Sequence, residues 1–338
     1  MAKVDIKLLA KELNVSTSTV SRALNDSYSI SETTKQKVRN LAEKLNYQPN
    51  PYAKSLVQKS SRTIAVIIPD IENSFFSSCI DGINAIATNY GYHVLIYLTH
   101  EDHEQELSIV KSLLNGRVDG LLISVSKNTV NADHLKKLAC KIPVVFFDRI
   151  IPGSGLPSVN NDDFESGFAA ARHLIDNGAK KLLYLGLSTR LSTDRQRKEG
   201  FLQALNGFNS CTCEEIYFDQ VKKSYLFELF QEKYQQDEGF DGIFASSENL
   251  VFLCYEFINK LSLKIPDDVK ILGFSNSPSS AFLRPSLTTI TQPAREIGLK
   301  AAEVLFTLMK GKDTSESYPV SLKSRLLIRE STGCVEVM

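Results

Sequence analysis

Apolar residues near the N-terminus recur at the spacing of short helices. Over residues 6–13 they follow the i, i+3, i+4, i+7 pattern of a helix with one buried stripe. A second helix is predicted to begin near Ser16 or Thr17, whose hydroxyl group can cap its first turn, and a third at Ser31. A tight turn around Asn14 would separate the first two, so the pattern predicts a helix-turn-helix unit.

The second of these helices is predicted to have a polar outer face. Its apolar residues Val20 and Leu24 pack inward, which leaves outside the side chains of Thr17, Ser18, Ser21 and Arg22. Short hydroxyl groups can donate to phosphate oxygens or base edges, and an arginine can bind guanine with two hydrogen bonds. The alternative is a solvated face whose hydroxyl groups only cap the helix.

From residue 63 onward, strand-like apolar runs alternate with helical patterns. Seven such runs are TIAVIIP, HVLIYL, DGLLISV, PVVFFD, KLLYLG, DGIFAS and VKILGF. Several of the helical segments between them end at a glycine, as helices commonly do. Alternating βα units predict parallel sheets with helices on both faces, and the length of this part suits two such halves.

The charge of the chain is divided unevenly, although its net value is zero. Residues 1–62 hold eleven Lys and Arg against five Asp and Glu, a net charge of +6, so the remainder carries −6. A small basic head on a larger acidic body is typical of a polyanion-binding module joined to a part with another task. This division favours the DNA-binding interpretation of the second helix.

Composition argues against membrane and metal-binding classes. The N-terminal residues lack the apolar stretch of a secretory signal, and the longest apolar runs are only long enough for strands. We therefore expect a cytoplasmic protein, associated with the nucleoid through DNA, with no membrane partner. The six cysteines are scattered, and only Cys211 and Cys213 lie close together, so reduced thiols and no metal site or cofactor are expected.

An enzymatic function is not favoured by any motif. The strongest candidate is GFSNS, which resembles the G-x-S-x-G turn of a nucleophilic serine but lacks its second glycine. All five histidines precede it, whereas that catalytic order needs a later one. We therefore expect no catalytic residues. A sugar-binding or sensor protein without DNA binding remains the alternative if the basic head is only a solvated cap.

A series of short motifs covers essentially the whole chain. Four lie near the N-terminus: VSTSTVSRALN, ISETT, NYQPN and AKSL. Others follow at RTIAVIIPDIENSFF, RVDGLLI, PVVFFDR, DRQRKEGF, IPDDVKILGF, LRPSLTTITQP and RESTG. In this order and spacing the chain resembles the lactose and galactose repressor (LacI/GalR) family of bacterial transcription regulators.

The resemblance implies an α/β fold in two parts. An N-terminal all-α helix-turn-helix head (residues 1–48) is joined by a hinge helix or linker (49–61) to a two-lobed, doubly wound body (62–338). The body would be similar to type I periplasmic sugar-binding proteins, with a ligand between the lobes and three chain crossings. Its first lobe would comprise about 62–160 and 291–320, and its second about 161–290 and 321–338.

The resemblance also implies which residues bind DNA. Thr17, Ser18 and Arg22 match positions that read base edges. Phosphates would be held by Ser16, Thr19, Ser21 and Asn25. The short helix over residues 52–58 would add Tyr52, Lys54 and Leu56. Leu56 matches a leucine that the family wedges into the minor groove, and Lys54 stands where arginine is commoner in the family.

Effector binding is likewise implied at a set of positions in the body. They are Ser74, Phe75, Phe76, Asp148, Arg149, Asp162, Arg195, Arg197, Ser247 and Ser275. The chain departs from the family where Ser275 and Asn276 replace two acidic or amide residues that begin with Asp, and where Ser247 and Glu248 replace Asn-Asp. Loss of an acceptor carboxylate beside retained arginines predicts a more positive cleft, and hence a sugar derivative with an anionic group, such as a sugar phosphate or uronate.

These expectations combine into one functional hypothesis. The chain is expected to be a sequence-specific DNA-binding regulator, a repressor, controlled by a carbohydrate-like effector. A single head reads few base pairs, so we expect a homodimer on a near-palindromic operator. Residues 249–258 are apolar nearly all round, which predicts either a buried helix or an oligomer face. Whether the effector releases or promotes DNA binding does not follow from the sequence.

Overall fold

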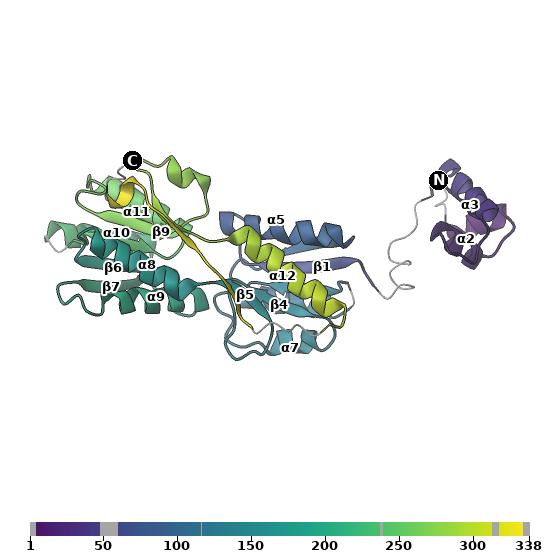
Figure 1. Cartoon of the computed structure of the whole chain (residues 1–338), viewed down its shortest axis with the longest axis horizontal. Helices are drawn as coiled ribbons and strands as arrows, with labels where there is room; N and C mark the ends of the chain where they lie inside the picture. Colours follow the sequence, from purple (N-terminus) through teal and green to yellow (C-terminus); the bar gives the residue numbers. More distant parts are fainter. Residues whose placement is uncertain (1–4, 48–59, 116, 237–238, 313–317, 334–338) are drawn as a thin grey trace. The chain divides into compact units, whose positions relative to one another are not determined.

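The computed structural model describes residues 5–47, 60–115, 117–236, 239–312 and 318–333. The chain divides into two units, residues 1–61 and residues 62–338, and each is described by itself (Figure 1). Within the described part, no helix is both long enough and apolar enough to cross a membrane.

The first unit contains the three predicted helices, α1 (Ile6–Glu12), α2 (Thr17–Leu24) and α3 (Glu32–Lys44). Each begins after a residue whose side chain caps it, namely Asp5, Ser16 and Ser31. The turn between α1 and α2 places Asn14 at a φ of 53°, a left-handed conformation that asparagine tolerates better than most residues. The small core consists of Leu9, Ala10, Val20, Ala23, Val38 and Ala42.

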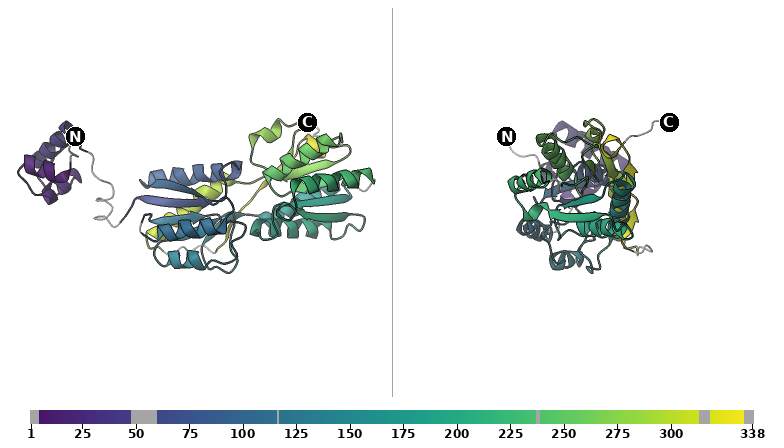
Figure 2. Two further views of the ribbon diagram at one scale, coloured as in Figure 1. Left: turned by 180° about the vertical axis from the view of Figure 1, so that it is seen from behind. Right: turned by 90° about the vertical axis from the view of Figure 1, so that its left-hand side faces the viewer.

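The second unit has two lobes, each with a six-stranded sheet (Figure 2). The sheet of the first lobe has the order β11-β5-β4-β3-β1-β2 and all its pairs are parallel. Its strands are β1 (Thr63–Ile68), β2 (His93–Leu98), β3 (Gly120–Ile123), β4 (Val144–Phe147), β5 (Ser158–Asn161) and β11 (Val320–Leu322). Its helices are α5 (Ser74–Asn89), α6 (His103–Leu113), α7 (Asp133–Ala139) and α12 (Ala294–Met309).

Strand β1 shows why the central strands of this sheet are apolar runs. Ile64, Val66 and Ile68 belong to the cluster that includes residues of α5 and α12. Ala65 and Ile67 belong to a separate cluster with residues of α6 and α7. Because helices cover both faces of the sheet, both sets of alternating positions must be apolar.

The sheet of the second lobe has the order β12-β10-β9-β8-β6-β7, and only the β10–β12 pair is antiparallel. Its strands are β6 (Lys181–Gly186), β7 (Thr212–Tyr217), β8 (Gly242–Ala245), β9 (Lys270–Phe274), β10 (Thr288–Thr291) and β12 (Arg325–Leu327). Its longer helices are α8 (Asp163–Asp176), α9 (Ser192–Leu205), α10 (Lys223–Gln235) and α11 (Glu248–Lys260). Short 3₁₀ turns occur at Phe218–Gln220, Pro278–Ala281 and Glu330–Thr332.

The chain passes between the two lobes between β5 and α8, between β10 and α12, and between β11 and β12. The doubly wound α/β architecture with three crossings, which the resemblance implied, is therefore confirmed. All seven predicted apolar runs form strands.

Two helices of the second lobe cross at a pair of glycines. A Cβ atom on Gly167 of α8 would lie 1.9 Å from the backbone oxygen of Arg197, and one on Gly200 of α9 would lie 1.9 Å from that of Phe164. Only glycine permits so close an approach of the two backbones. The contact fixes α9, and with it Arg197, against α8. Helices α5 and α12 cross in the same way at Gly82 and Gly298.

Candidate functional site

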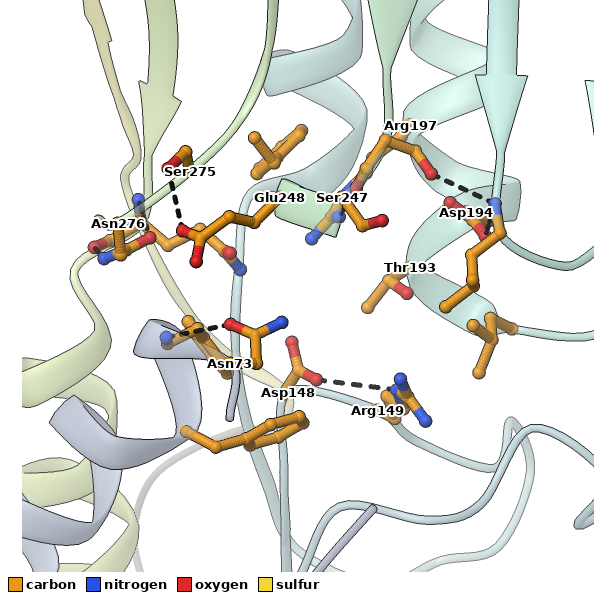
Figure 3. A pocket seen from close by; sticks show the side chains of 17 residues that line it. Asn73, Asp148, Arg149, Thr193, Asp194, Arg197, Ser247, Glu248, Ser275 and Asn276 are labelled. Atoms are coloured by element: carbon orange, nitrogen blue, oxygen red, sulfur yellow. Dashed lines mark hydrogen bonds and ion pairs between the residues drawn. The ribbon is translucent and has the colours of Figure 1, made fainter. Parts of the chain in front are cut away.

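A pocket lies where the carboxyl ends of strands from both lobes meet (Figure 3). It contains about 530 Å³ of empty space, including its opening to solvent, which is within the usual range for small-molecule sites. Residues that follow β4, β8 and β9 line it, as expected for open α/β sheets. Its lining includes seven of the predicted effector-binding residues: Phe75, Phe76, Asp148, Arg149, Arg197, Ser247 and Ser275.

Arg197 is the most constrained cation of the pocket. Its Nε donates to Asp163 Oδ1 at 2.6 Å, its Nη1 donates to the backbone oxygen of Ser246 at 2.5 Å, and its guanidinium carbon lies 3.6 Å from the ring centre of Phe274. Burial disfavours the cation, but the carboxylates of Asp163, Asp194 and nearby Asp148 outweigh this and raise the pKa of Arg197. Arg197 is therefore positively charged, and its guanidinium group is held in one orientation.

Two acidic side chains beside it are buried. Burial raises the pKa of Asp163 to about 6, although the Arg197 guanidinium acts in the opposite direction. Burial also raises the pKa of Asp148, opposed by Arg149 and Arg197. Asp148 has a φ of 61°, a left-handed conformation that aspartate, like asparagine, tolerates better than most residues. It directly follows β4 and lines the pocket.

Arg149 is already bound to a carboxylate outside the pocket lining. Its Nη1 donates to Glu101 Oε1 at 2.8 Å and to Glu101 Oε2 at 3.0 Å, and also to the backbone oxygen of Val125. Its guanidinium carbon lies 5.9 Å from the ring centre of Phe76. Phe75 and Phe76, in edge-to-face contact at 5.3 Å, provide the apolar wall of the pocket.

Glu248 supplies a carboxylate beside the serine that replaces the family's acidic residue. Ser275 Oγ donates to Glu248 Oε2 at 2.7 Å, and Ser74 Oγ of the first lobe donates to the same atom at 2.8 Å. Ser74 thus contacts Glu248 and does not itself line the pocket. This bond joins the two lobes directly, because Glu248 begins helix α11 of the second lobe.

Two more predicted effector-binding residues lie outside the lining. Asp162 Oδ1 accepts from the backbone N–H of Ser324 at 2.8 Å and from Ser166 Oγ at 3.2 Å, so it braces the crossing segments between the lobes. Arg195 is exposed on α9. It is two positions from Arg197, and residues two apart on a helix point in different directions. Neither residue is part of the pocket lining in this structure.

Sequence reasoning did not include several lining residues among the ligand contacts. They are Asn73, Leu187, Leu191, Thr193, Asp194, Ser246, Glu248, Phe274, Asn276 and Gln292. Asp194 could have been found, because it is three positions before Arg197 and shares its side of the helix. Its Oδ2 accepts from the backbone N–H groups of Leu187 and Ser188 at 2.9 and 2.7 Å.

The pocket does not have the excess of positive charge that the sequence suggested. Its lining carries three carboxyl side chains, Asp148, Asp194 and Glu248, and two guanidinium groups, both bonded to carboxylates. The sequence suggested an anionic ligand because Arg149, Arg195 and Arg197 are retained while an acceptor carboxylate is missing. The structure turns Arg195 to solvent and provides Glu248 as an acceptor.

The outer face of α2 carries the predicted DNA-contacting residues of the head. Thr17, Ser18 and Arg22 are exposed. Ser16 does cap the helix, since its Oγ accepts from the backbone N–H of Thr19 at 3.1 Å, so one hydroxyl group fulfils the capping alternative. Nearby are three more predicted residues, Thr19, Ser21 and Asn25. Tyr52, Lys54 and Leu56 lie outside the described residues.

Across the described part of the chain, no group of three or more His, Cys, Asp and Glu side chains could hold a metal ion. The pocket lining itself contains no histidine or cysteine.

Comparison with known protein families gives two matches that together span nearly the whole chain. Residues 5–50 match the bacterial regulatory proteins of the lacI family. Residues 61–329 match the periplasmic binding proteins and sugar binding domain of the LacI family. The chain belongs to the LacI family. It is therefore a DNA-binding transcriptional regulator with an effector-binding domain.

Curated proteins similar to this chain include transcriptional regulators. Catabolite control protein A of Priestia megaterium is 30% identical over 97% of this chain and 99% of its own length. The transcriptional repressor CytR of Escherichia coli K12 is 30% identical over 97% of this chain and 95% of its own.

Solved structures of this fold include proteins with sugars bound. A regulator from Alkaliphilus metalliredigens complexed with D-xylulofuranose is 26% identical, with a TM-score of 0.70 over 80% of this chain and 98% of that one. A LacI family regulator from Enterococcus faecium with bound ribose is 26% identical, with a TM-score of 0.69 over 81% and 100%. The lac repressor dimer bound to operator and an anti-inducer shares the fold, with a TM-score of 0.82 over 98% and 99% at 22% identity.

Proposed function

We propose that this LacI-family regulator is a homodimer that represses transcription from a near-palindromic operator and binds a small sugar or sugar derivative in the pocket between its lobes. The observation that carries the proposal is the combination of an interlobe pocket with a capped, polar helix-turn-helix face on one chain. Such a regulator works in the cytoplasm, at the nucleoid. The proposed parts are a head (residues 1–48), a linker (49–61) and an effector-binding body (62–338).

The pocket suits a polyhydroxy ligand. Asp148 and Glu248 offer acceptors, Arg149 and Arg197 offer donors, and the phenylalanine wall suits the apolar face of a sugar ring. Relatives of similar fold hold D-xylulofuranose and ribose. We therefore propose these four polar side chains, with Ser247 and Ser275, as the ligand contacts, backed by Asp163 and Ser74.

For DNA we propose that Thr17, Ser18 and Arg22 read base edges from the major groove, while Ser16, Thr19, Ser21 and Asn25 hold phosphates. Exposure of the first three on α2 supports these roles. Tyr52, Lys54 and Leu56 are proposed to complete the contact from the linker.

Two exposed apolar features of the body support dimer formation. Strand β2 is the edge strand of the first sheet, and its Leu95 and Ile96 are 43% and 41% exposed. Phe282 in the second lobe is 75% exposed. An apolar edge strand left uncovered would pair with other chains. Helix α11, in contrast, buries most of its apolar residues within its own lobe, so its all-round apolar pattern reflects core packing.

Selection from a random pool of duplex DNA tests the proposal. The full-length chain at fixed salt should enrich a palindromic site, and Arg22→Ala should lower affinity for that site by roughly 5- to 150-fold, the value of a bidentate arginine–guanine contact. Affinity for unrelated DNA should fall much less, because phosphate contacts remain. Tyr28→Ala, at an exposed position after α2, is the matched control. No enriched site for the wild-type chain would contradict the proposal.

A further inference from the structure

Glu248 receives three hydrogen bonds on one of its two carboxylate oxygens. Ser275 Oγ at 2.7 Å, Ser74 Oγ at 2.8 Å and the backbone N–H of Ser277 at 3.1 Å all donate to Oε2. The donors come from both lobes and from two backbone segments. The carboxylate is therefore held in one orientation, by two donors of its own lobe and by Ser74 of the other.

The second oxygen, Oε1, receives no hydrogen bond from any of the described residues. Glu248 lines the pocket, and Figure 3 shows its carboxylate turned into the space beside Asn73 and Asn276. An oriented carboxylate oxygen without a donor is a strong acceptor for a ligand hydroxyl group. It cannot accept anything from a second carboxylate or from a fully ionised phosphate, which have no hydrogen to donate.

Neither cation of the described pocket lining forms an ion pair with Glu248, so the protein does not neutralise this carboxylate. The two lining guanidinium groups, of Arg149 and Arg197, are already bonded to Glu101 and Asp163. An anionic group placed beside Oε1 would therefore meet like charge in a partly desolvated site, and this is a penalty that a neutral hydroxyl group avoids.

We propose that Glu248 determines effector class: it accepts a hydroxyl group of a neutral sugar through Oε1 and excludes sugar acids and sugar phosphates. The inference rests on the proposed effector function of the same pocket. It reverses the expectation of an anionic ligand that the sequence alone favoured. Oε2 of the same carboxylate accepts the hydrogen bond from Ser74 of the opposite lobe. A ligand bound to Oε1 would therefore share Glu248 with the contact that joins the lobes.

Calorimetric titration of the full-length chain tests the inference with two sets of probes. The neutral set is D-ribose, D-xylulose and cellobiose, and the anionic set is D-ribose 5-phosphate, D-gluconate and D-glucuronate. The wild-type chain should bind at least one neutral probe and prefer it to every anionic one. Glu248→Gln should weaken the preferred neutral probe by about tenfold, the worth of one charge-assisted hydrogen bond, and should narrow or reverse the preference over anionic probes.

Two further variants separate selection from structural damage. Ser74→Ala removes the donor from the first lobe but keeps the charge, so it should weaken all probes while leaving the neutral-to-anionic ratio unchanged. Glu228→Gln, at an exposed position on α10, should change neither the probe affinities nor the neutral-to-anionic ratio.

The failures of the two proposals are distinguishable. A wild-type chain that binds no probe of either set would argue against the effector function itself. A wild-type chain that binds an anionic probe best, or a Glu248→Gln variant that folds and binds with an unchanged ratio, would overturn the role of Glu248 while leaving the effector function standing.

Discussion

Replacing Arg197 with methionine should abolish effector binding and destabilise the body by about 3–5 kcal/mol, the usual cost of removing one partner of a buried ion pair. Methionine fills a similar length but leaves the carboxylate of Asp163 buried without its partner. It also removes a donor from the pocket lining. Titration with the best-binding sugar and the midpoint of urea unfolding measure the two effects.

The matched control is Arg195→Met, two positions away on the same helix and exposed. Its unfolding midpoint should stay within the equivalent of about 0.5 kcal/mol of the wild-type value, with sugar binding retained. The double variant Arg197→Met with Asp163→Asn should recover part of the lost stability, because both charges are then absent, but not the binding. Loss of binding in Arg195→Met alone would contradict the placement of Arg197, and not Arg195, among the ligand contacts.

Gly200→Ala should have the second large effect. The new Cβ would lie 1.9 Å from the backbone oxygen of Phe164, so α8 and α9 would have to separate and open the core between them. Overpacking of this kind costs about 1–3 kcal/mol and sometimes more, and a backbone clash belongs at the upper end. Since α9 carries Arg197, sugar binding should fall as well.

Thermal unfolding provides the measurement, with Glu199→Ala as the control at the neighbouring exposed position. A loss of about 3 kcal/mol corresponds to a fall of roughly 6–12 °C in the midpoint for a domain of this size. If Gly200→Ala unfolded at the same temperature as Glu199→Ala, the close crossing of the two helices could not be holding α9 in place.

Most of the elements that the sequence predicted bury a continuous or periodic set of apolar residues. Each helix of the head buries one apolar stripe. Six of the seven predicted strands are buried, because burial on both faces of a sheet requires apolar residues. Strand β2 is the exception, an apolar edge strand with no buried residue. Strand β7, with the sequence TCEEIY, was missed since it is an edge strand with polar positions. Strands β10, β11 and β12 are three or four residues long and give little pattern to detect.

The pocket could be predicted only in part, because the direction in which each side chain points is not evident from the sequence. Asp148 and Arg149 were found because they directly follow a buried strand. Asp162 and Arg195 were each expected to face the ligand, but the neighbouring Asp163 and the helix position of Arg197 carry the buried ion pair instead. One or two residues along a helix change which way a side chain points.

Contacts between distant parts of the chain were outside the reach of sequence reasoning. Glu101 and Arg149 are 48 positions apart, and Ser74 and Glu248 are 174 apart. These two contacts determine how two charges of the pocket are held: one pairs Arg149 with a carboxylate, and the other fixes the carboxylate of Glu248. The sequence showed which charges were present but not which were already paired.

The most direct test of an effector-controlled regulator is the reciprocal coupling between its two ligands. The affinity of the full-length chain for its selected operator should be measured with and without saturating sugar, and the affinity for sugar with and without operator, at one salt concentration. The account predicts the same factor in both experiments, of about 5- to 150-fold in either direction. Equal operator affinity with and without a sugar that demonstrably binds would contradict it, because the pocket and the head would then act independently.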